Sequence, residues 1–143
     1  MARKTMCAGV LAVLLMISIP LFAHHGTGIS YDSSKAITSK AIVTEFVFSN
    51  PHVRIFFDVT DEKGNVTHWS GEMANPAQFL RDGWNKRRLE KEFAPGTPLT
   101  VTYHVSKAQE HLPPGTGAAL VMKVVNANGD VIGLVRPGAG GQQ

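Results

Sequence analysis

From residue 36 onward the sequence alternates between apolar and polar positions, and turn residues separate the alternating stretches. The first three stretches are rich in β-branched and aromatic residues and predict strands over residues 36–49, 53–60 and 66–73. In the second stretch, alternation places Ile55 and Phe57 on one face and Phe56 and Asp58 on the other. Pro51 cannot donate to a sheet ladder and predicts a bend between the first two strands. The turn sequence "DEKGN" then predicts a hairpin of the second and third.

The pattern changes after residue 74, where it favours helix. Asn75 is placed to cap a helix, Pro76 suits its first position, and Gln78 completes the spacing of a capping box. Gly83 predicts its end. A second short helix is expected within 84–93, capped by Asn85, with Trp84 and Leu89 at the spacing of a hydrophobic staple.

Alternation returns in the last third of the chain. Strands are predicted over 97–107, where Val101 and Tyr103 face inward and His104 outward, and over 118–127. An "NGD" turn leads from the latter into a strand at 131–135. The remaining tail, 136–143, is predicted to be disordered.

Three strands, a helical connection and two or three further strands are the element order of the OB-fold, a five-stranded barrel with a helix between strands three and four. We therefore predict a mainly β, OB-fold-like barrel over residues 36–135. An open β-sandwich or another small barrel is the competing architecture. A fold of this kind does not by itself define a function.

The first 23 residues have the plan of a secretory signal peptide. Arg3 and Lys4 precede an apolar run over 6–19, and the small residue Ala23 follows. The run is shorter than the roughly 20 residues of a membrane-spanning helix. We expect cleavage after Ala23, an uncleaved anchor being the alternative, and a periplasmic or secreted protein that starts with an extended arm, 24–35.

Cleavage changes the charge and the cysteine content. The chain has 14 Lys and Arg against 11 Asp and Glu, and loss of Arg3 and Lys4 leaves 12 against 11. A strongly basic nucleic-acid footprint is therefore absent. Cys7 is the single cysteine and is removed, so cysteine-ligated metal sites are excluded. No nucleophile elbow or phosphate-binding loop is present, which favours a binding module over an enzyme.

Several fragments together resemble one protein family. "AHHG", "FVFSNPH", "DVTDEKGNVTHW", "GEMANPAQFLRDGW" and "LTVTYHV" are similar to a family of small exported bacterial proteins known as a domain of unknown function. The resemblance spans about residues 22–135. It departs at Gly26, Ala41 and Phe48, where the family has Ser, Gly and Trp. It implies export and brings no established activity.

The paired histidines at the predicted mature terminus are the first candidate site. A free His24 offers its α-amine and imidazole to one ion, and His25 allows ligation by amine, deprotonated amide and imidazole. Such nitrogen donors suit Cu(II), which heads the divalent affinity order. His52, after the bend, is the expected partner from the folded domain. The alternative is that the arm carries no ligand.

Other ligand-binding candidates lie on the third strand and at the second helix. Alternation places His68 and Glu72 on one face, where they could pair or bind a metal, and Trp69 on the other. Trp84 adjoins a cationic cluster, for which a solvated helix face is the alternative. The function expected is thus an exported binding module for copper or another transition metal. The competing function is a cell-envelope protein or glycan interaction module around Trp69 and Trp84.

Overall fold

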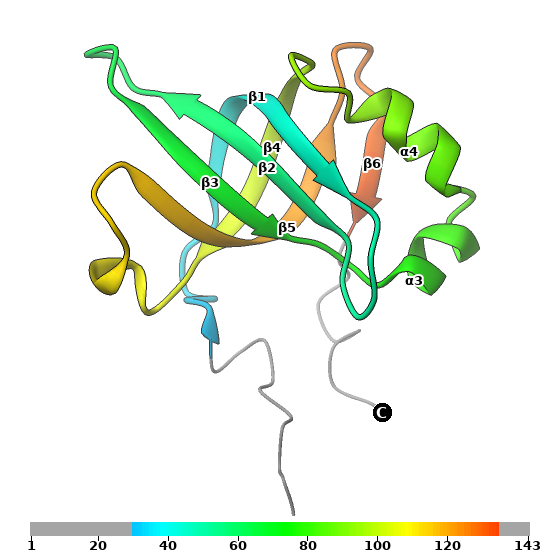
Figure 1. Cartoon of the computed structure of the whole chain (residues 1–143), viewed down its shortest axis with the longest axis horizontal. Coiled ribbons are helices and arrows are strands. Elements are labelled where there is room, and N and C mark those ends of the chain that lie inside the picture. The colour runs from blue at the N-terminus through cyan, green and yellow to red at the C-terminus, as the bar shows by residue number, and fades with distance from the viewer. Residues whose placement is uncertain (1–29, 135–143) are drawn as a thin grey trace, which may run out of the picture.

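The structure, a computed structural model, describes residues 30–134 (Figure 1). The predicted signal peptide over 1–23, the first part of the arm with His24 and His25, and the predicted tail over 136–143 lie outside the described residues.

Six strands and two short α-helices make up the described chain (Figure 1). The strands are β1 (Ile37–Val47), β2 (Arg54–Thr60), β3 (Val66–Glu72), β4 (Pro98–Val105), β5 (Thr116–Val125) and β6 (Val131–Leu134). Between β3 and β4 lie the helices α3 (Pro76–Arg81) and α4 (Lys86–Glu92), and a 3-10 turn, η1 (Gln109–His111), lies between β4 and β5.

Five strands close into a barrel. β1 pairs antiparallel with both β2 and β4, β2 with β3, and β4 with β5. A parallel pairing of β3 with the first half of β5 completes the ring, and β6 adds to the second half of β5. This ring, with helix between strands three and four, is the OB-fold arrangement, so the predicted fold is confirmed. Both helices lie on one side of the barrel beside β6 (Figure 1).

The barrel interior is filled by the residues that alternation assigned to it. Ile55, Phe57 and Val101 are fully buried, and Tyr103 is 2 % exposed. The polar partners in alternation point outward, and no charged or polar residue among those described is buried. Packing therefore follows the period of two along each strand.

Two glycines let the barrel close tightly around aromatic side chains. A Cβ at Gly117 would lie 2.4 Å from the ring of Trp69, and one at Gly71 would lie 2.7 Å from Val121. The parallel β3–β5 pairing places Gly117 beside Trp69. A side chain at either glycine would displace the core.

The caps of α3 form as predicted, with one exception. The Asn75 side chain accepts from the Gln78 backbone N–H, and Pro76 begins the helix. The reciprocal half of the predicted capping box is wrong, because the Gln78 side-chain oxygen accepts from the Arg81 guanidinium (2.7 Å) and not from the Asn75 backbone N–H. Gly83, at φ +82°, ends the helix in a Schellman arrangement, in which Trp84 N–H bonds to Phe79 C=O.

The start of α4 also follows the sequence. The Asn85 side chain accepts from the Arg88 backbone N–H. Trp84 and Leu89, the predicted staple, are 8 % and 0 % exposed. Within residues 30–134 no helix has both the length and the apolar character needed to cross a bilayer.

Strand ends differ from the predictions by a few residues. β1 stops at Val47 rather than 49, because its last pair with β2 is Val47 with Arg54 and the chain bends at residues 50 and 51. β5 begins at Thr116, two residues early, because Thr116 and Gly117 already pair with β3. β1 also carries an irregularity between Val43 and Glu45.

Candidate functional site

His52 is held at the end of the β1–β2 connection by bonds to the end of β3. Val53 N–H donates to Ala74 C=O, and Met73 N–H donates to Val53 C=O. Val53 and Met73 are both buried, so the backbone on this side of His52 is fixed by the core. These bonds bring the last residue of β3, Glu72, beside the imidazole.

The His52 ring faces one acceptor at each nitrogen. Nδ1 lies 3.2 Å from the carbonyl oxygen of Met73, and Nε2 lies 3.4 Å from Oε1 of Glu72. A carbonyl only accepts, so Nδ1 carries the proton that makes this bond. Nε2 faces the Glu72 carboxylate, to which it donates when the ring is protonated.

Glu72 is shared between His52 and a third residue, Tyr31. The Tyr31 hydroxyl donates to Oε2 of Glu72 at 3.0 Å, which leaves Oε1 for His52. Arg54 lies directly opposite Glu72 in the β2–β3 register, and its guanidinium stands over the Phe56 ring. Glu72 therefore joins two segments that are 41 residues apart in the chain, Tyr31 and β3.

Tyr31 is anchored to the barrel by backbone bonds. It bridges to Ser106 at the end of β4, Asp32 N–H donates to Val105 C=O, and Lys107 N–H donates to Ser30 C=O. Burial, and secondarily the nearby Glu72 carboxylate, raise the pKa of Tyr31 from 10.0 to about 12. The phenol is thus a neutral donor at any ordinary pH.

His68 lies on the same outward face of β3 as Glu72, as predicted, but the two do not pair. His68 Nδ1 lies 2.6 Å from Oδ1 of Asp58, its cross-strand neighbour on β2. His68 is 66 % exposed at its side chain. This is a closed two-residue pair at some distance along the strand from His52 and Glu72.

The two tryptophans pack rather than form an open platform. Trp69 is partly buried and packs against Phe57 and Tyr103, with ring centroids 6.4 and 4.8 Å away. Trp84 is 8 % exposed, and the Arg88 guanidinium lies 3.8 Å above its ring. For Trp84 the structure therefore shows the alternative given above, a solvated cationic helix face with the indole ring packed beneath it.

The other two described histidines stand apart from this site. His104 Nδ1 lies 3.1 Å from the carbonyl of Lys35, and His111 lies 3.5 Å from its neighbour Glu110. Among residues 30–134 no three His, Cys, Asp or Glu side chains converge as a complete metal site. The described part of the chain thus offers at most two such groups at one place.

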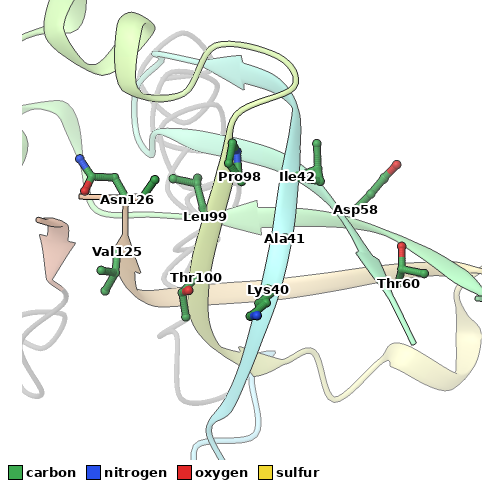
Figure 2. A pocket seen from close by; sticks show the side chains of 11 residues that line it. Lys40, Ala41, Ile42, Asp58, Thr60, Pro98, Leu99, Thr100, Val125 and Asn126 are labelled. Atoms are coloured by element: carbon green, nitrogen blue, oxygen red, sulfur yellow. The ribbon is translucent and has the colours of Figure 1, made fainter. Parts of the chain in front are cut away.

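An open hollow of about 390 Å³ lies on the outer face of β1, β2 and β4 (Figure 2). Lys40 and Ile42 of β1, Asp58 of β2 and Thr100 of β4 line it. Ile42 is 46 % exposed there. The hollow contains neither His52 nor Glu72, so it is separate from the Tyr31–Glu72–His52 cluster.

Two contributors were missed by the sequence reasoning. Tyr31 lies in a polar stretch without periodicity, residues 24–35. It is the single Phe, Tyr or Trp residue of that stretch, and this was the one feature that could have indicated a contact with the barrel. Asp58 was placed outward but not beside His68. A symmetric hairpin about the "DEKGN" turn pairs residues 58 and 68, so the register alone could have found it.

The fold and this cluster together define an OB-fold barrel with a histidine–carboxylate–tyrosine group where the chain enters the barrel. The family of unknown function DUF6152 matches residues 12–112, and the chain belongs to it. The match begins before the paired histidines and ends ahead of β5. No curated protein and no solved structure matches the chain.

Proposed function

We propose that the protein is an exported binding module that holds a transition metal, copper first, between its processed amino terminus and His52. In this proposal residues 1–23 are a cleaved signal peptide and the mature protein works in the periplasm or outside the cell. His24 supplies its α-amine and imidazole, with His25 as the alternative donor. His52 supplies Nε2.

One observation carries the proposal: Tyr31 is anchored beside Glu72, and Glu72 lies beside His52. Tyr31 follows His24 by seven residues, which span up to roughly 23 Å at about 3.3 Å each. The terminus therefore needs to cover only the short distance from Tyr31 past Glu72 to the imidazole. The seven residues 24–30 are therefore long enough to bring the nitrogen donors of His24 to the imidazole of His52.

The state of the His52 ring supports the same proposal. Metal-bound histidines usually donate their second ring N–H to a carbonyl or carboxylate, which fixes the tautomer and the ring orientation. His52 already makes that bond to Met73 through Nδ1, and its side chain is 41 % exposed. Nε2 is thus oriented and accessible.

The competing function, an envelope protein or glycan module around Trp69 and Trp84, has less support. Trp84 is buried and Trp69 is partly buried against Phe57 and Tyr103, so neither indole stands as a free aromatic platform for a sugar ring or a partner. The outer hollow on β1, β2 and β4 is a surface that such a module could use (Figure 2).

The test is a Cu(II) titration of the processed protein alongside three variants. One carries an extra alanine before His24, which moves the α-amine one residue away. The second is His52→Ala. The third, His104→Ala, is the matched control, because His104 also bonds a backbone carbonyl through Nδ1 but lies elsewhere.

We expect tight one-to-one binding that both the extension and His52→Ala weaken, whereas His104→Ala leaves it unchanged. The extension separates the α-amine from the residue that carries the His24 imidazole, and His52→Ala removes a nitrogen donor. Equal, weak binding by all four proteins would contradict the proposal and favour the interaction module.

A further inference from the structure

The charges of the described protein are distributed unevenly between its helices and its barrel. Residues 81–92 hold five Lys and Arg against three Asp and Glu, whereas the other described residues hold six against eight. Both helices lie on the same side of the barrel (Figure 1). Positive charge is therefore gathered on the helical side of a molecule whose described part is formally neutral.

The two acidic residues of α4 have partners that turn them away from most of these cations. Lys86 Nζ lies 3.6 Å from Oε1 of Glu90, one turn further along the same helix. The Asn126 amide, which follows β5, donates to Oε2 of Glu92 at 3.1 Å. One acid is thus matched by one lysine, and the other is bonded to the barrel.

The outward side of α4 carries two cations at its centre. Leu89 is fully buried and marks the inward side. Arg87 precedes it by two residues and Lys91 follows it by two, so at 3.6 residues per turn each lies about 200° around the helix from it. Within residues 30–134 no ion pair involves Arg87 or Lys91. Like charges four residues apart on a helix repel, and here nothing in the described chain offsets them.

Two more arginines keep their charge at the edges of this side. The Arg88 guanidinium lies 3.8 Å above the Trp84 ring, and Arg81 donates to the side-chain oxygen of Gln78 at 2.7 Å. Both partners are neutral, and Asp82 is itself bonded to the Gln78 amide. We call the resulting exposed set the cationic face; it consists of Arg81, Arg87, Arg88 and Lys91.

The stability of the helix does not account for these cations. The first turn of α4 contains Lys86, Arg87 and Arg88 and no acidic residue. The amino end of a helix carries the positive end of its dipole, which favours Asp and Glu there and disfavours Lys and Arg. Among the cations of α4 only Lys91, in the last turn, is favourably placed. The first-turn cations therefore lower the stability of α4, which points to a negatively charged partner outside the chain.

We propose that the cationic face docks the protein on the surface of an anionic phospholipid bilayer. Basic residues near such a surface are attracted by its negative potential. The proposal needs neither residues 24–29 nor a bound metal, so it is independent of the function proposed above.

The form of the face fits a bilayer better than a nucleic acid. Proteins that bind single strands stack the bases on open aromatic rings, whereas Trp84 is 8 % exposed and lies beneath Arg88. A long polyanion would also run along the barrel, where acidic residues are in excess. A bilayer meets only the helical side, and there α3 adds Leu80, 56 % exposed, as an apolar side chain that can enter the headgroup layer.

The experiment is co-sedimentation with vesicles of phosphatidylcholine alone and of phosphatidylcholine with one-third phosphatidylglycerol. The protein starts at His24, because the apolar run over 6–19 would itself enter bilayers. The test variant is Arg87→Gln/Lys91→Gln. The matched control, Lys40→Gln/Lys63→Gln, removes the same charge from β1 and from the β2–β3 turn, which lies on the other side of the molecule from α4 (Figure 1).

We expect the wild-type protein to bind the mixed vesicles, to ignore pure phosphatidylcholine, and to dissociate in about 1 M salt, where charges are screened within about 3 Å. Arg87→Gln/Lys91→Gln should weaken binding at least about tenfold, since each basic residue at such a surface contributes about fivefold. The control should bind as the wild type does. The urea midpoint of the test variant should not fall, because Gln is as good a helix former as Arg and Lys.

Equal binding by the test variant and the control, or equal binding to both kinds of vesicle, would overturn the inference. The same proteins are also titrated with a single-stranded oligonucleotide at the same salt concentration. Tighter binding to the oligonucleotide than to the mixed vesicles, lost in Arg87→Gln/Lys91→Gln, would assign the face to nucleic acid and would likewise overturn the inference.

Discussion

Tyr31 links the entry of the chain to the barrel, and its hydroxyl reports on Glu72. Burial and the carboxylate both favour the neutral phenol, which is why its pKa lies near 12 rather than 10.0. The protein has two tyrosines, so Tyr31 is the single phenol in a Tyr103→Phe background.

In that background we predict a phenolate absorbance titration centred near pH 12. Adding Glu72→Gln removes the charge but not the burial, so the pKa of Tyr31 should fall without reaching 10.0. An unchanged titration would show that the hydrogen bond to Glu72 does not form in solution.

The same residue predicts a pH dependence of stability. The pKa of Tyr31 is raised on folding, so its contribution is complete below pH 10.0 and is lost as the pH rises through about 12. Between these values the urea midpoint of the Tyr103→Phe protein should drop more steeply than that of the Tyr31→Phe/Tyr103→Phe protein. Parallel curves would contradict this assignment.

Gly117 offers a test of the core. An added Cβ would lie 2.4 Å from Trp69, so Gly117→Ala should destabilise the protein by about 1–3 kcal/mol, the usual range for overpacking. Chemical denaturation measures this. Combination with Trp69→Phe should recover part of the loss, and strict additivity of the two changes would contradict the predicted contact.

At the scale of elements, the helix caps separate what the local sequence determines from what it does not. Asn75 accepts from Gln78 N–H, whereas the Gln78 side chain bonds Asp82 and Arg81 on the helix surface. We predict that Asn75→Ala costs about 1 kcal/mol and that Gln78→Ala costs only a few tenths, measured by urea unfolding. Equal losses would mean that the capping box forms after all.

The strands and caps were predictable because their causes are local. Alternation in 53–60 and in 97–107 fixes the buried faces, and Asn75, Pro76 and Gly83 fix the limits of α3. Barrel closure was inferred only from element order, since the parallel pairing of β3 with β5 joins segments about 48 residues apart. The predicted start of β5 was two residues late, because this pairing with β3, and not the local sequence, determines where β5 begins.

The site was predictable only in part, for the same reason. His52 and Glu72 were each singled out, but their contact depends on bonds between Val53 and the Met73–Ala74 segment. Tyr31 reaches Glu72 through pairing with Ser106, which nothing in its own neighbourhood indicates. Residue types were readable from the chain, whereas their convergence is a property of the closed barrel.

At the scale of the whole molecule, the account requires export and cleavage. We predict that mass determination of the exported protein gives a chain beginning at His24. The physical reason is the apolar run over 6–19 between Arg3 and Ala23. A product that retains Cys7, or that starts well beyond His25, would remove the free amine on which the metal proposal depends.

The central claim is that one metal ion joins the processed terminus to the barrel. The most direct measurement is the imidazole nitrogen NMR spectrum of the ¹⁵N-labelled processed protein during titration with Zn(II), which has no unpaired electrons and stands in for copper in this measurement. The account predicts that His24 and His52 change together and are complete at one equivalent, while His68, His104 and His111 keep their signals. A His52 signal that stays unchanged after His24 is saturated would contradict the account.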